Sequence, residues 1–141
     1  GQLTAGDLRQ LAAANSSVQL TTGRMMIVKT LPGPDSHLIT TPEDKRLSVA
    51  VCTGAPHCPS ASVRTRDLAE SLVRVGAWSG AKTLHISGCA KGCAEPEARD
   101  ICIVGRDGRF DIVEKGCAWQ TPSSTDILAT DILERVSELG S

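Results

Sequence analysis

The chain has 141 residues, of which 40 % are hydrophobic and 22 % charged, and its net charge is −1. These values suit one or two small globular domains. A near-neutral charge and 2 % aromatic residues exclude the basic, base-stacking surface typical of nucleic-acid-binding proteins. No run approaches the ~20 apolar residues of a membrane-spanning helix, and no signal peptide is recognisable. We expect a cytoplasmic protein with neither a nucleic-acid nor a membrane partner.

The first 45 residues are predicted to form a small unit of one helix and two strands. A helix is expected from Thr4 to Asn15, because Thr4 and Asp7 form a capping-box pattern and the apolar residues share one face. Two short strands, 18–20 and 26–28, are expected on either side of a glycine-containing turn.

Residues 46–141 are predicted to form a second domain with the order β-α-β-β-β-α. Its expected elements are a strand at 47–51, a helix that opens at Pro59, strands at 83–87, 100–104 and 109–113, and a helix at 124–139. The pair Asp107-Gly108 is a strong hairpin signal between two alternating segments. The chain is therefore predicted to be an α+β protein, an α/β-type sandwich with a mixed sheet and flanking helices.

The spacing of four cysteines indicates a metal centre. Cys52 and Cys58 are separated by five residues, Cys89 and Cys93 by three, and each pair follows a predicted strand. If these strands are neighbours, the four thiolates converge at one edge of a sheet, where they could hold zinc or an iron–sulfur cluster. Gaps of five and three residues suit a cluster better than the tighter loops of structural zinc sites. Zinc and unliganded thiols remain alternatives at this point.

The remaining cysteines and the tryptophans are expected to have structural roles. Cys102 lies in an alternating strand and is predicted to be a buried core residue, while Cys117 is predicted to be an exposed thiol in a polar loop. Neither is expected to be a ligand. Trp78 and Trp119 are predicted to be packing residues.

The cysteine motifs also carry a resemblance to a known family. The segments Thr53-Gly-Ala-Pro-His-Cys58-Pro-Ser60 and His85-Ile-Ser-Gly-Cys-Ala-Lys-Gly-Cys-Ala94 resemble the cluster motifs of the sulfite and nitrite reductase hemoprotein superfamily, most closely those of its precorrin-3B synthase branch. This resemblance implies a ferredoxin-like half-domain at 1–45, followed by a sulfite/nitrite reductase-like [4Fe–4S] domain at 46–141. It also implies that the chain matches the second half of a longer enzyme, whose N-terminal half would be a partner.

The resemblance implies both a cofactor and a reaction. Cys52, Cys58, Cys89 and Cys93 would bind a [4Fe–4S] cluster, with siroheme or a mononuclear iron as a further centre. The reaction would be an oxygen-dependent hydroxylation of the tetrapyrrole precorrin-3A at C20, with formation of a γ-lactone. NADH would be the electron source, acting through an electron-donating reductase. A siroheme-dependent sulfite or nitrite reductase fragment is the first alternative, and a non-catalytic cluster- or zinc-binding module is the second.

Three cationic residues are expected to bind the tetrapyrrole or the cofactor. Arg24 lies at a position that resembles the family's basic contact to tetrapyrrole carboxylates, which arginine binds through two hydrogen bonds. Lys91 lies within the second cysteine motif, and Arg64 follows the first. Lys29 and Arg66 are weaker candidates for the same role. No catalytic residue is predicted.

Overall fold

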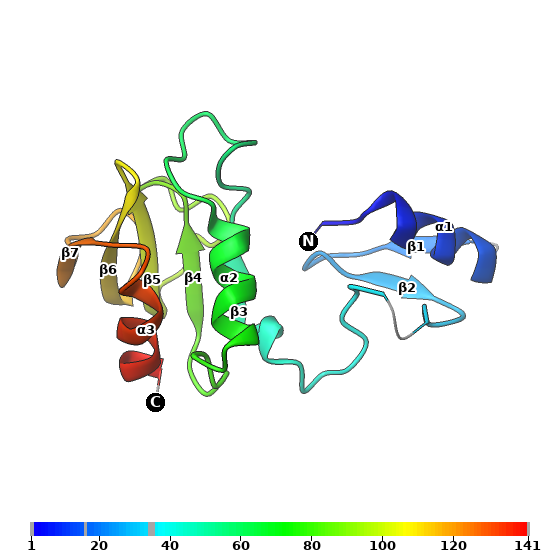
Figure 1. The fold of residues 1–141 in the computed structure, drawn as a ribbon. Helices are drawn as coiled ribbons and strands as arrows, with labels where there is room; N and C mark the ends of the chain where they lie inside the picture. The colour runs from blue at the N-terminus through cyan, green and yellow to red at the C-terminus, as the bar shows by residue number, and fades with distance from the viewer. Residues whose placement is uncertain (1, 16, 34–35, 141) are drawn as a thin grey trace. The chain divides into compact units, whose positions relative to one another are not determined.

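The computed structural model describes residues 2–15, 17–33 and 36–140. The chain divides into two compact units, Gly1–Asp44 and Lys45–Ser141 (Figure 1). None of the helices in the described ranges has the length and hydropathy that crossing a bilayer requires.

The first unit contains helix α1 (Ala5–Ala14) and an antiparallel hairpin of β1 (Val18–Leu20) and β2 (Met26–Val28). The predicted capping box is confirmed: the Asp7 amide donates to Thr4 Oγ1 over 3.0 Å, and the Thr4 amide donates to Asp7 Oδ2 over 2.9 Å. The hydrogen bonds from Thr4 also lower the pKa of the Asp7 carboxyl group. The helix begins at this point because two of its first amides are satisfied locally.

Asn15 joins the end of α1 to the segment after β2. Its Nδ2 donates to the carbonyl oxygens of Leu11 (3.2 Å) and Thr30 (3.0 Å), and its Oδ1 accepts from the Thr30 amide over 2.7 Å. Leu11 is buried beneath this junction, whereas Leu20 and Ile27 on the hairpin are exposed. Polar links therefore contribute much of the order in this unit.

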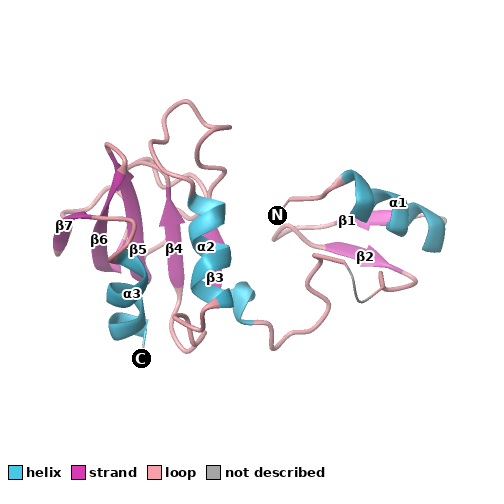
Figure 2. Cartoon of the chain, viewed as in Figure 1, coloured by secondary structure: helices cyan, strands magenta, loops and turns pink. Residues whose placement is uncertain are grey.

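The second unit is built on a five-stranded mixed sheet in the order β3-β4-β5-β6-β7. The strands are β3 (Val49–Val51), β4 (Leu84–Ser87), β5 (Arg99–Arg106), β6 (Arg109–Gly116) and β7 (Ser124–Ile127). β3, β4 and β5 run parallel, and β5, β6 and β7 are antiparallel. With helices α2 (Thr65–Arg74) and α3 (Ile132–Gly140), this architecture confirms the predicted α+β class (Figure 2).

Both helices pack on one face of the sheet. Leu68 and Leu72 of α2 and Ile132 and Val136 of α3 belong to one buried cluster with alternating residues of β4, β5 and β6. Trp78 is completely buried in the same cluster, and its Nε1 donates to Ser48 Oγ over 2.8 Å, which confirms its predicted packing role. Burial of this apolar face is the main stabilising contribution to the unit.

The prediction of a helix that opens at Pro59 is wrong. Pro59 lies in a turn, and α2 begins six residues later at Thr65. The backbone between them closes tight turns instead: the Cys58 amide donates to the Gly54 carbonyl, and the Ala61 amide donates to the Cys58 carbonyl. In a helix that began at Pro59, the Val63 carbonyl would accept from the amide four residues later, but it accepts instead from the Ala55 amide.

The predicted helix at 124–139 is also wrong in its first half. Residues 124–127 form β7, which pairs with β6, and the helix begins only at Ile132. The buried Asp111 carboxylate accepts from the Asp126 amide over 3.1 Å and so anchors the strand. The predicted strand at 47–51 is shortened in turn, because Lys45–Ser48 forms a 3-10 helix.

The hairpin prediction at Asp107-Gly108 is confirmed. β5 and β6 pair from Arg106↔Arg109 to Arg99↔Gly116. Both turn residues have positive φ, 49° at Asp107 and 80° at Gly108, as the favoured two-residue hairpin turn requires.

Leu72→Ala should lower the free energy of unfolding by about 2–5 kcal/mol, because Leu72 is 1 % exposed and truncation leaves a cavity. Chemical denaturation followed by circular dichroism measures this loss. Val75→Ala is the matched control: Val75 is 57 % exposed, and its truncation should change stability by less than about 0.5 kcal/mol. Equal losses in the two variants would contradict the packing described here.

Candidate metal centre

The two cysteine pairs follow neighbouring parallel strands. Cys52 comes directly after β3, and Cys89 is the second residue after β4, with Gly88 between them. The Cys52 amide donates to the Ile86 carbonyl over 3.1 Å, which extends the pairing of the two strands beyond their ends. Residues 52–63, the first cysteine loop, and residues 88–95, the second cysteine loop, therefore leave the sheet at the same edge.

A backbone-to-sulfur hydrogen bond joins the two loops. The Gly88 amide donates to Cys52 Sγ over 3.1 Å. Amides that donate to sulfur stabilise a thiolate and tune any metal that it binds. Gly88 is required at this point, because an ideal Cβ on it would lie 2.6 Å from Ala61 Cβ. The absence of a side chain thus allows the loops to approach closely.

Thr65, a residue that the sequence analysis did not select, fixes the start of the first loop. Its side chain is fully buried, and its Oγ1 donates to the Cys52 carbonyl over 2.9 Å. Gly54 passes directly beside it with φ of +67°, and an ideal Cβ there would lie 2.2 Å from Thr65 Oγ1. The first residue of α2 therefore determines how the chain leaves β3.

All four motif cysteines are free thiols. Cys52, Cys58 and Cys89 are half-buried, whereas Cys93 is exposed. Within residues 2–15, 17–33 and 36–140, no three His, Cys, Asp or Glu side chains gather closely enough to hold a single metal ion.

The second cysteine loop rests on an aromatic side chain. An ideal Cβ on Gly92 would lie 2.9 Å from Trp119 Cζ3 and 3.3 Å from Ala118 Cβ, so the indole ring packs directly on the glycine. Trp119 is 54 % exposed and therefore packs with only part of its surface. Its predicted packing role is confirmed for the part of the indole ring that contacts Gly92.

A glutamate–arginine pair closes the second loop. Glu95 Oε2 accepts from Arg99 Nη2, and Glu95 Oε1 accepts from the Glu97 amide over 3.1 Å. The hydrogen bond from Arg99 lowers the pKa of Glu95, against the opposing effect of partial burial. Glu95 is therefore an ionised carboxylate whose charge Arg99 balances.

The cationic residues that were predicted to bind anionic groups are divided between the two units of the chain. Lys91 donates from Nζ to Ser60 Oγ over 3.0 Å and so links the second cysteine loop to the first. Arg24 and Lys29 belong to the first unit and are exposed; Arg24 lies on the β1–β2 turn with φ of 60°. A non-glycine residue with positive φ is uncommon and costs free energy, so Arg24 holds an unusual backbone conformation.

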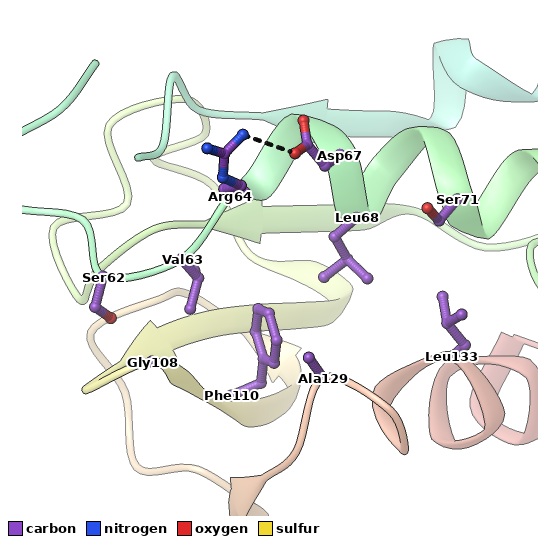
Figure 3. A pocket seen from close by; sticks show the side chains of 10 residues that line it. All are labelled: Ser62, Val63, Arg64, Asp67, Leu68, Ser71, Gly108, Phe110, Ala129 and Leu133. Atoms are coloured by element: carbon purple, nitrogen blue, oxygen red, sulfur yellow. Dashed lines mark hydrogen bonds and ion pairs between the residues drawn. The ribbon is translucent and has the colours of Figure 1, made fainter. Parts of the chain in front are cut away.

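Arg64 lies at the rim of a cavity of about 490 Å³ (Figure 3). Val63, Leu68 and Phe110 provide an apolar floor, and Arg64 forms an ion pair with Asp67 at 3.3 Å on the rim. The cavity adjoins the first cysteine loop through Val63, whose carbonyl accepts from the Ala55 amide over 2.9 Å.

Cys102 lies on the sheet face opposite the helices and is completely buried. Burial, assisted by the nearby Cys117, raises the pKa of its thiol to about 12. The thiol stays protonated at neutral pH and lies 3.4 Å from His85 Nδ1. The predicted core position of Cys102 is confirmed. Cys117 is half-buried rather than fully exposed, and its Sγ donates to the Pro96 carbonyl over 3.6 Å.

Gly88→Ala should destabilise the second unit by about 1–3 kcal/mol, because the added methyl group overlaps Ala61. Urea unfolding of the purified chain measures the effect. Gly33→Ala is the control, since an ideal Cβ at Gly33 meets no atom within 4 Å. If both variants were as stable as the parent chain, the two loops would not be in the contact described.

Comparison with known proteins supports the resemblance of the motifs. No family model matches the chain. The chain is 38 % identical over 84 residues to a precorrin-3B synthase from Sinorhizobium sp.. That match covers 58 % of this chain and 18 % of the length of the relative. The similarity to precorrin-3B synthase that the cysteine motifs predict is therefore confirmed over more than half of the chain.

Proposed function

We propose that this chain holds a [4Fe–4S] cluster through Cys52, Cys58, Cys89 and Cys93, as part of an oxidoreductase of the precorrin-3B synthase type. The observation that carries the proposal is the hydrogen bond from the Gly88 amide to Cys52 Sγ. It places a thiolate-stabilising donor between two cysteine loops that leave adjacent parallel strands. The similarity to a precorrin-3B synthase supports the same assignment.

The residues present fit the proposed cluster. Soft thiolate ligands favour zinc, copper(I) or iron–sulfur centres over the hard cations that carboxylates select. Each cysteine would bind a different iron, so the thiols need not surround one point as they must around a single zinc ion. Gly54 and Gly88 leave room beside Cys52, because side chains there would overlap Thr65 and Ala61.

The two compact units support the proposed domain assignment. We assign residues 1–45 to a ferredoxin-like half-domain and residues 46–141 to a sulfite/nitrite reductase-like [4Fe–4S] domain. The division of the chain between Asp44 and Lys45 is compatible with this assignment. All four proposed ligands lie in the second unit, in the loops that follow β3 and β4 of its five-stranded sheet.

The proposed reaction is the conversion of precorrin-3A to its C20-hydroxylated γ-lactone. One atom of O2 enters the product and the other leaves as water, with two electrons supplied by NADH through a reductase. The cluster, when bound, supplies single-electron transfer to the centre that reacts with oxygen. Because the match spans 18 % of the relative, the activity of the whole enzyme is part of the proposal.

Arg64 is the strongest candidate in the second unit for a contact to a substrate carboxylate. Its ion pair with Asp67 is exposed, with side chains 68 % and 65 % accessible. Such pairs contribute only about 0–1 kcal/mol, so an incoming carboxylate can replace Asp67. The apolar cavity floor beside Arg64 would accept part of the macrocycle. We propose the same anion-binding role for Arg24 on the first unit.

Anaerobic reconstitution should load about four irons and four sulfides per chain. Changing any of the four proposed ligands to serine should abolish or severely reduce this uptake, because a cubane needs one thiolate for each iron. Cys102→Ser and Cys117→Ser are matched controls that should retain it. Iron and sulfide assays with EPR measure the outcome. One zinc per chain without sulfide, or loss of the cluster in Cys117→Ser, would refute the assignment.

The intact enzyme that contains this chain should incorporate one labelled oxygen atom into the lactone product when precorrin-3A is supplied with labelled O2 and NADH. Mass spectrometry of the product measures the incorporation. Reduction of sulfite or nitrite, accompanied by a siroheme spectrum, would instead favour the reductase alternative.

A further inference from the structure

Apart from the thiols, the two cysteine loops carry two formal charges, the ammonium group of Lys91 and the carboxylate of Glu95 at the end of the second loop. Residues 52–63 and 88–94 include no Asp or Glu, and Lys91 is the one Lys or Arg among them. The next carboxylate along the chain, Glu95, is balanced by its ion pair with Arg99. The charge of Lys91 is therefore not cancelled within the loops.

Lys91 connects the loops through Ser60. Its Nζ donates to Ser60 Oγ over 3.0 Å, across 31 positions of sequence. A lysine side chain on a surface is ordinarily mobile, because four torsions must be fixed to hold it. The hydrogen bond to Ser60 alone would not hold the lysine side chain firmly. The position of its charge therefore also depends on how well the backbone is fixed at Ser60 and at Lys91.

The backbone that carries Ser60 is fixed against the second loop. The Ala61 amide donates to the Cys58 carbonyl over 3.1 Å, which closes a turn around Ser60. Ala61 Cβ then lies against Gly88, at 2.6 Å from where a Cβ on that glycine would stand. The backbone of Ser60 is consequently held beside the second loop.

The backbone that carries Lys91 is fixed from the other side. Gly92 has φ of +63° and packs between Trp119 and Ala118, and its carbonyl accepts from the Glu95 amide over 3.1 Å. Both ends of the Lys91–Ser60 link are therefore anchored independently of the link itself. The backbone at each end is set before the link forms, and the hydrogen bond to Ser60 then limits where the Lys91 ammonium group lies.

We propose that Ser60 positions the Lys91 ammonium group beside the cluster and that this fixed charge raises the reduction potential of the cluster. The proposal rests on cluster binding by the four motif cysteines as proposed above. Reduction adds one electron to a centre that four thiolates already make negative. A nearby cation stabilises the more negative state, and solvent moderates the effect because Lys91 and Ser60 are both exposed. Ser60 acts as a positioning residue and Lys91 as the source of the charge.

The test is a redox titration of the reconstituted chain, with dithionite as the electron donor and the EPR signal of the reduced cluster as the readout. K91Q removes the charge but retains an amide donor for Ser60, and K91M removes both. Each should lower the equilibrium constant for one-electron reduction about tenfold, which is a decrease of about 59 mV. K91R should restore most of the parent value, because it restores the charge.

Variants of Ser60 distinguish the effect of the position of the Lys91 ammonium group from the effect of its charge. S60A keeps the lysine but releases it, so the potential should fall in the same direction by a smaller amount, and S60T should restore it. Lys115→Met is the matched control: Lys115 lies next to Gly116 at the end of the β5–β6 ladder opposite the hairpin turn, and its loss should leave the potential unchanged.

Iron and sulfide are assayed in every variant before the titration. If the parent chain takes up neither, the proposed function fails. If the cluster assembles and neither K91Q nor K91M changes its potential, the role of Lys91 is overturned while the proposed function stands. A shift in Lys115→Met as large as that in K91Q would likewise overturn it, and an unchanged potential in S60A would remove the role of Ser60.

Discussion

The close approach of three backbone segments at Gly88 is the constraint on which the candidate site depends. The Gly88 amide reaches Cys52 Sγ, and Ala61 lies against the glycine from the first cysteine loop. Gly105 of β5 also approaches it closely, since a Cβ there would lie 2.8 Å from the Gly88 carbonyl oxygen. A side chain on Gly88 would overlap Ala61, so the two loops could not keep their present distance.

The parallel part of the sheet makes this approach possible. Because β3, α2 and β4 form a crossover unit, both strands deliver their following residues to the same edge. α2 contributes twice: its apolar face closes the core, and Thr65 at its first turn holds the Cys52 carbonyl. Stability and site geometry therefore depend on the same helix, so that damage to the core also affects the position of the cysteines.

Local patterns predicted much of this arrangement. The capping box at Thr4, the Asp107-Gly108 hairpin and the cysteines at strand ends all depend on neighbours in sequence, and these predictions agree with the structure. The late start of α2 and strand β7 were missed, because turns around Cys58 and the contact of Asp126 with Asp111 override the local periodicity. The links of Lys91 to Ser60 and of Glu95 to Arg99 have no signature in the sequence.

The burial of Cys102 has a consequence for oxidative damage. Peroxide oxidises cysteine through the thiolate rather than the thiol, and only where it can reach the sulfur. With a pKa near 12 and no exposed surface, Cys102 presents neither the reactive form nor an approach to it. The interior of the sheet is therefore protected from sulfenic acid formation, whereas the exposed Cys93 is accessible to oxidants whenever it holds no metal.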